Sequence, residues 1–145
     1  MNKIDMEQST RLNEIEISKI LVQFDIHNIL SFELLIGGSE NTNYLVKSES
    51  GKYVLCIFEQ KTEKNAKELA HLLKHLEINN LNTSKLIYTS DSESVIIWNN
   101  KPIIIKTFIE GEIRKDFPPH LLKLIGKELA KLHQINVPEY LPKQL

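Results

Sequence analysis

Cysteine is almost absent from the chain: Cys56 is the single cysteine among 145 residues, so no disulfide can form within it. Structural disulfides are typical of secreted proteins, and we therefore expect a cytoplasmic protein. No apolar run approaches the roughly 20 residues that a membrane-spanning helix needs. Residues 1–6 also lack the apolar region of a signal peptide, so the sequence predicts no association with a membrane.

The chain carries no excess of charge of either sign. It has 18 lysines and arginines against 19 aspartates and glutamates, which gives a formal net charge of −1. Proteins with a broad nucleic-acid surface are usually basic, so we expect no nucleic-acid partner. Hydrophobic residues make up 41% of the sequence and charged residues 26%, which is typical of one globular domain with its own core.

The first half of the chain predicts one helix followed by three strands. The helix covers residues 10–24. Its apolar face is formed by Leu12, Ile15, Ile20, Leu21 and Phe24. Alternating apolar residues then predict strands over 31–36, 43–48 and 53–58. Gly51 supplies a positive φ in the short turn between the second and third strands, so we expect a meander.

The second half predicts a helix, a strand, a hairpin and a final helix. Thr62 is a suitable N-cap for a helix that ends near residue 78, and residues 85–89 form a strand. Residues 94–98 and 102–108 form a hairpin that turns at Asn99 and Asn100, and Pro102 fits the start of an edge strand. Pro118 and Pro119 suit the first turn of the last helix. The apolar face of that helix is formed by Leu122, Ile125, Leu129 and Leu132. The fold class is therefore α+β: an antiparallel meander sheet with one inserted helix and a helix at either end.

A glycine pair precedes the second predicted strand. Gly37 and Gly38 lead into a polar tip of sequence SENTNY. Glycine allows the backbone to approach a ligand closely, and consecutive amide groups in such a turn can bind an anion. Asn41 and Asn43 are open to two interpretations, because asparagine side chains stabilise turns as readily as they bind ligands.

Four stretches in this order resemble the N-terminal lobe of the aminoglycoside phosphotransferase/choline kinase superfamily, and within it the type II homoserine kinases. They are ENTNY at 40–44, YVLCIFE at 53–59, FIEG at 108–111 and IGKELAKLH at 125–133. The last stretch is similar to the family pattern Gly-x-x-Leu-Ala-x-Leu-His, and the resemblance covers about residues 10–140. It implies a protein-kinase-like lobe with a helical segment at 1–28, a sheet and helix at 29–109, and a hinge with the first helix of a C-terminal lobe at 110–145.

The resemblance also implies ATP-dependent phosphorylation of a hydroxyl group on a small molecule, with homoserine preferred over aminoglycoside or choline-type alcohols. The loop residues expected over the nucleotide phosphates are Gly37, Gly38, Ser39, Asn41, Thr42 and Asn43. Val54 would face the adenine ring, and Phe108, Ile109 and Glu110 would offer backbone groups to its edge. Glu68 matches the helix glutamate of the family, although it is equally consistent with a surface charge.

The sequence departs from the family at two points. Most members carry a lysine or arginine on the third strand, where this chain has Cys56, and either Lys106 or Lys47 could substitute. The chain also contains no His-Gly-Asp motif, which the family uses in its catalytic loop. Phosphoryl transfer needs such a residue and carboxylates for Mg²⁺. We therefore expect this chain alone to lack kinase activity, with the Mg²⁺ ligands in a C-terminal lobe.

Other functions remain open at this stage. A kinase-like lobe could act as a non-catalytic nucleotide- or protein-binding module, and the apolar face of the last helix could then support a dimer. An unrelated α+β domain that binds a peptide along a strand edge is a further alternative. His71 and His75 are spaced as in a zinc-binding helix, but Leu72 replaces the glutamate of that motif, so we expect no metal site here.

Overall fold

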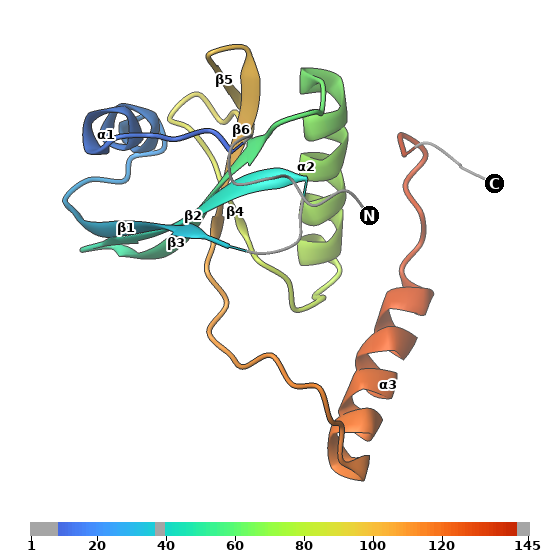
Figure 1. Ribbon diagram of the computed structural model, residues 1–145. Helices are drawn as coiled ribbons and strands as arrows, with labels where there is room; N and C mark the ends of the chain where they lie inside the picture. The colour runs from blue at the N-terminus through green and yellow to red at the C-terminus, as the bar shows by residue number, and fades with distance from the viewer. Residues whose placement is uncertain (1–8, 37–39, 142–145) are drawn as a thin grey trace.

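The computed structural model describes residues 9–36 and 40–141. An antiparallel sheet of six strands forms its centre, with α1 against one face and α2 against the other (Figure 1). The strand order is β1-β2-β3-β6-β4, and β5 pairs with β6. Within the described residues, none of the helices has the length and apolar character needed to span a membrane.

The first three strands form the predicted meander. β1 covers Ile29–Leu35, β2 covers Asn41–Ser48 and β3 covers Gly51–Phe58. Gly51 has a φ of +145° directly after the two-residue turn, which a residue with a side chain rarely adopts. β2 pairs with β3 from Asn41 opposite Phe58 to Ser48 opposite Gly51. This continuous register fixes which side chains of the two strands share a face.

β6, at Lys101–Thr107, is a central strand. It pairs with β3 on one side, and with β4 (Leu86–Ile87) and β5 (Ile96–Trp98) on the other. The edge-strand prediction for Pro102 was therefore wrong. The pairing between β3 and β6 ends at Ile103, one residue after Pro102. No hydrogen bond between these two strands therefore requires the N–H that proline lacks, and Pro102 is tolerated.

The predicted turn between β5 and β6 is confirmed. Asn99 and Asn100 have φ values of 47° and 63°, and two successive positive φ values characterise the type I′ turn of a tight hairpin. Asparagine tolerates this conformation better than most residues. The predicted strand at 85–89 is shorter than expected and consists of Leu86–Ile87.

Helix α1, at Glu14–Val22, packs on the first face of the sheet. It begins with a capping box, in which the side chain of Asn13 accepts from the amide of Glu16 and the side chain of Glu16 accepts from the amide of Asn13. Ile17, rather than the predicted Ile15, faces the core: Ile15 is 66% exposed, whereas Ile17 is fully buried. The helix starts at Glu14, four residues later than predicted, so Leu12 lies before it. The first buried residue within the helix is Ile17. The sheet residues of this core are Tyr44, Val46, Leu55, Ile57, Ile103 and Ile105.

Helix α2, at Glu63–Ile78, packs on the second face. Thr62 is its N-cap as predicted, and its hydroxyl accepts a hydrogen bond from the amide of Asn65 at 3.2 Å. Ala66 and Ala70 are the buried residues of the helix, and their small side chains let it lie close to the sheet. The second core also contains Cys56, Phe58, Leu86, Val95 and Ile104.

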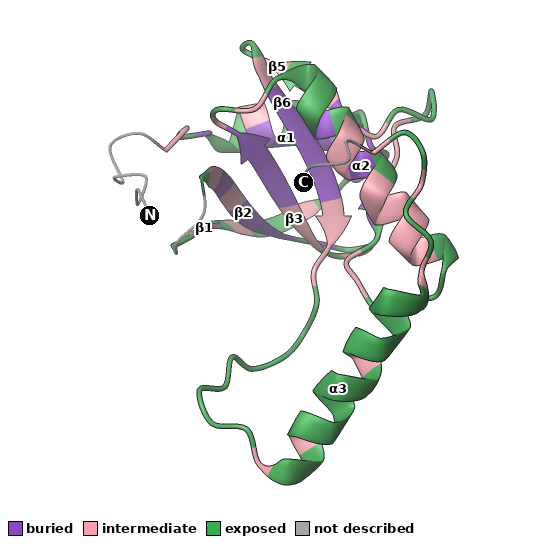
Figure 2. Cartoon of the chain, turned by 90° about the vertical axis from the view of Figure 1, so that its right-hand side faces the viewer, coloured by how far each residue is buried: buried purple, intermediate pink, exposed green. Residues whose placement is uncertain are grey.

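Helix α3, at Pro119–Gln134, lies apart from the sheet at the end of an exposed segment. Pro118 and Pro119 form its first turn as predicted. None of its residues is buried, and Figure 2 shows its surface as almost entirely exposed. The segment after it returns to α2: the Nε2 atom of His75 lies 2.7 Å from the carbonyl oxygen of Asn136, and the Tyr140 hydroxyl donates to the carbonyl of His71 at 3.1 Å.

Candidate functional site

The alternation of side chains along β2 divides the predicted loop residues between two faces. Asn43 stands opposite Cys56, which belongs to the core beneath α2. Tyr44 stands opposite Leu55, which belongs to the core beneath α1. Because side chains alternate with a period of two, Asn41 and Asn43 face the α2 side and Thr42 faces the α1 side. The structure thus brings the two asparagines together but separates Thr42 from them.

Val54 and Cys56 of β3 lie on the same face as the two asparagines. Cys56 is almost fully buried, and burial raises the pKa of its thiol to about 11 although the charges of Lys106 and Lys61 act in the opposite direction. A neutral, buried thiol behaves as a small apolar side chain and is a poor nucleophile. The third-strand position at which the family resemblance raised the question of a lysine or arginine is therefore uncharged in this protein.

The sheet also places the two lysines that were candidates for this cation. Lys106 stands opposite Val54 on β6 and is half-buried. Lys47 stands opposite Lys52, at the end of β2 distant from Asn43, and is exposed. Glu68 projects from α2 with intermediate exposure, and it makes no salt bridge to any residue in the described part of the chain.

Phe108, Ile109 and Glu110, the predicted hinge, follow β6 directly. The amide of Phe108 donates to the carbonyl of Lys52 at 3.0 Å, and the Glu110 carboxylate forms a salt bridge with the Lys52 ammonium. These contacts tie the start of the hinge to the start of β3. The amide of Phe108 is thereby occupied, while Ile109 and Glu110 are exposed. Gly37, Gly38 and Ser39, the predicted phosphate loop, lie outside the described residues.

A polar network that the sequence analysis did not predict lies behind β2. The Glu59 carboxylate, 7% exposed, accepts from the Thr42 hydroxyl at 2.6 Å and from the Thr10 amide at 3.0 Å, and forms a salt bridge with Lys101. The Lys101 ammonium also donates to the Thr10 hydroxyl at 2.8 Å. Four segments distant in sequence therefore meet at one carboxylate. Glu59 directly follows the apolar strand β3. A charged residue at that place was the sequence signal that could have indicated this network.

The same network reaches the residues before α1. The Tyr44 hydroxyl donates to the carbonyl of Thr10 at 2.9 Å and accepts from the amide of Leu12 at 3.0 Å. Burial acts to raise the pKa of Glu59, but the hydrogen bonds from Lys101, Thr42 and Thr10 outweigh it, and the pKa is lowered. Thr42 is thus fixed from the α1 side, while its neighbours in β2 face the α2 side.

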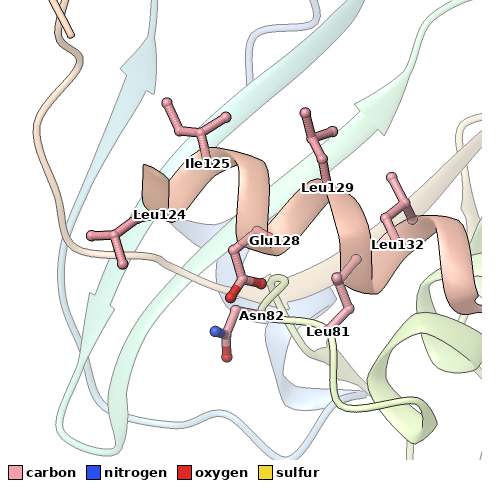
Figure 3. Close-up of a pocket in the computed structure, with 7 residues that line it drawn as sticks. All are labelled: Leu81, Asn82, Leu124, Ile125, Glu128, Leu129 and Leu132. Atoms are coloured by element: carbon pink, nitrogen blue, oxygen red, sulfur yellow. The ribbon is translucent and has the colours of Figure 1, made fainter. Parts of the chain in front are cut away.

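An apolar groove lies between α3 and the segment that follows α2 (Figure 3). It is lined by Leu81, Asn82, Leu124, Ile125, Glu128, Leu129 and Leu132. None of these lining residues belongs to a strand of the sheet. Over residues 9–36 and 40–141, the structure holds no cluster of three or more histidine, cysteine, aspartate or glutamate side chains that could bind a metal ion.

Comparison with known proteins identifies the family. The model of the phosphotransferase enzyme family matches residues 31–144. The chain belongs to this family. The match begins in β1 and extends beyond α3, so it includes most of the sheet, helix α2, residues 108–110 and helix α3.

Two curated phosphotransferase relatives are homoserine kinases. That of Brucella anthropi is 31% identical over 128 residues, and that of Beijerinckia indica subsp. indica is 27% identical over 126 residues. Each alignment covers 86% of this chain but only 38% and 39% of the respective relative. The chain therefore spans less than half the length of the homoserine kinases it matches, and the resemblance to their branch is confirmed.

Solved structures confirm the kinase-like N-terminal lobe. A spectinomycin phosphotransferase, crystallised with ADP and spectinomycin, matches 89% of this chain with a TM-score of 0.73 at 19% identity, over 40% of its own length. The ethanolamine kinase of Plasmodium vivax matches 90% of the chain with a TM-score of 0.61 at 22% identity, over 36% of its own length. At these identities the likeness establishes the phosphotransferase fold and nothing finer.

We expect Glu59→Gln to lower the free energy of unfolding at pH 7 by about 1–3 kcal/mol, because the amide leaves the half-buried Lys101 without a counter-charge. Glu110→Gln is the matched control: it removes the exposed salt bridge to Lys52 and should cost less than about 1 kcal/mol. Urea denaturation of the three proteins gives both values.

The effect of Glu59 should also depend on pH. The pKa of Glu59 is lower in the folded chain than in the unfolded chain, where it is about 4.3. Its contribution to stability is therefore complete above that value and is lost as the pH falls through the folded pKa. The difference between wild type and Glu59→Gln should shrink below about pH 4.3. An equal difference at pH 7 and pH 3 would contradict this account of the network.

Proposed function

We propose that the chain is the nucleotide-binding lobe of an ATP-dependent kinase that transfers phosphate to a hydroxyl group of a small molecule. One observation carries this proposal: the register of β2, β3 and β6 puts Asn43, Cys56 and Val54 on one sheet face, and β6 leads directly from that face into the hinge at 108–110. A nucleotide bound along this face would place its adenine ring against apolar side chains and its phosphates near polar groups.

The residues on this face fit the requirements of ATP. Val54 offers an apolar surface for the adenine ring, and the exposed residues Ile109 and Glu110 could offer backbone groups to its polar edge. Asn41 and Asn43 can donate amide hydrogens toward the phosphates. The Glu59 network holds the intervening residue Thr42 from behind, so the start of β2 is fixed before a ligand binds.

The catalytic step would need residues beyond those described. Phosphoryl transfer requires Mg²⁺ to neutralise the phosphates and a group that orients the attacking hydroxyl. We propose that Mg²⁺ enters with the nucleotide, and that its protein ligands and the orienting residue belong to a second lobe. The homoserine kinase relatives are more than twice as long as the matched region, which leaves room for such a lobe.

Homoserine is the acceptor that we favour. The curated relatives described above are homoserine kinases, and each alignment covers 86% of this chain. The structural neighbours are named for spectinomycin and ethanolamine, so aminoglycoside and choline-type alcohols are the alternatives. Each is a small molecule with a hydroxyl group that can accept phosphate.

Isothermal titration of the chain with ADP tests the nucleotide site. We expect Val54→Trp to weaken ADP binding about tenfold or more, which corresponds to about 1.4 kcal/mol, because the indole ring occupies the space of the base. Leu30→Trp, at an exposed position of β1, is the control and should bind as the wild type does. Saturable binding that Val54→Trp leaves unchanged would place the nucleotide elsewhere.

A second proposal concerns the partner of α3. Its apolar face is exposed, with Leu122, Leu124 and Leu129 each about half accessible to solvent. Exposed patches of this kind usually mark an interface. We propose that the second lobe of the same kinase covers it, because the relatives extend well beyond the matched region. The alternative function, a non-catalytic binding module, would instead bury the face in a dimer.

The intact mass of the protein produced from its native gene separates these two alternatives. The alignment covers only 38% of the Brucella anthropi relative. We therefore expect the gene product to have a mass more than twice the 16.8 kDa of this chain. A product of 16.8 kDa would contradict the second lobe. If sedimentation also showed that this product dimerises and that Leu129→Glu abolishes the dimer, the binding module would be favoured.

A further inference from the structure

The proposed nucleotide face carries no positive charge on β3 next to Asn43. Cys56 is buried and neutral there, and Asn43 stands opposite it. Two or three phosphate groups at this place would carry several negative charges, and hydrogen bonds from amide groups alone would leave them without a counter-charge. A positively charged residue on the same face would add to the neutralisation by the Mg²⁺ that enters with the nucleotide.

Two lysines have the properties that this role requires. Among the described residues, Lys61 and Lys106 are the half-buried lysines that form no salt bridge, whereas the half-buried Lys74 and Lys101 each pair with a glutamate. Lys61 and Lys106 are also the two cations whose charge acts on Cys56, and the effect of Lys106 is the larger. A partly desolvated ammonium without a carboxylate partner is suited to an anionic ligand.

The strand register favours Lys106. Lys106 stands opposite Val54 and Ile104 opposite Cys56, so Lys106 is the diagonal neighbour of Cys56 on the adjacent strand. Diagonal neighbours have Cα atoms about 7–8 Å apart, within reach of a long side chain. Lys47 is opposite Lys52, which lies four residues from Cys56, or about 13 Å along the strand. The position of Lys61 beyond the end of β3 is not set by the sheet.

We propose that Lys106 supplies, from the neighbouring strand, the positive charge that binds the nucleotide phosphates in place of a cation at Cys56. This inference rests on the proposed nucleotide site. The flexible four-carbon stem of lysine carries a compact charge, so the ammonium can extend along this face toward the phosphates while the backbone of Lys106 remains in β6. Lys106 is thereby a specificity residue that distinguishes nucleoside phosphates from nucleosides.

The test compares ADP with adenosine, since both carry the base but only ADP carries phosphates. Both are titrated at low salt into the wild-type chain, Lys106→Met, Lys106→Arg, Lys61→Met and the control Lys47→Met. We expect Lys106→Met to weaken ADP binding at least about tenfold, the effect of losing one charged hydrogen bond, and to leave adenosine binding unchanged. Lys106→Arg and Lys47→Met should bind both ligands as the wild type does.

Three results would overturn the role of Lys106 without affecting the proposed nucleotide site. They are an unchanged ADP affinity in Lys106→Met, an equal loss of ADP and adenosine, and a loss confined to Lys61→Met. A wild-type chain that does not bind ADP would overturn the nucleotide site and this inference with it. Thermal unfolding of each variant confirms that it is folded, and Lys106→Gln replaces Lys106→Met if the latter does not fold.

Discussion

The register between β2, β3 and β6 is the constraint on which the rest of the structure depends. Because side chains alternate along a strand, a shift of one residue would exchange the two faces of the sheet. With the observed register, Tyr44, Leu55 and Ile105 join the core beneath α1, while Asn43, Cys56 and Lys106 face the α2 side. One pattern of pairing therefore creates both the core and the face that we assign to the nucleotide.

The buried network at Glu59 holds the sheet from the α1 side. Its carboxylate links the residues before α1 to β2, to the end of β3 and to the start of β6. A buried salt bridge of this kind contributes little net stability compared with apolar packing, but it specifies one arrangement of four segments. Its position directly behind Asn41 and Asn43 means that the same contacts support the fold and orient the proposed phosphate end of the site.

Local features of the structure could be predicted from the sequence, whereas features set by long-range pairing could not. The N-cap at Thr62 and the turn at Asn99 and Asn100 depend on neighbouring residues, and both were predicted. The central place of β6 depends on its pairing with β3, which is about fifty residues earlier in the chain. The choice between Lys106 and Lys47 needs the same pairing, so the sequence left it open.

The most direct test of the account is a map of amide chemical shifts on titration of the chain with ADP. The account predicts that the shifts change along one face of the sheet, at Asn43, Val54 and Cys56, and at the hinge residues 108–110, with smaller changes in α1. Changes confined to α1, or to the groove between α3 and Leu81, would contradict it, because the nucleotide would then bind where neither the sheet register nor the hinge can position it.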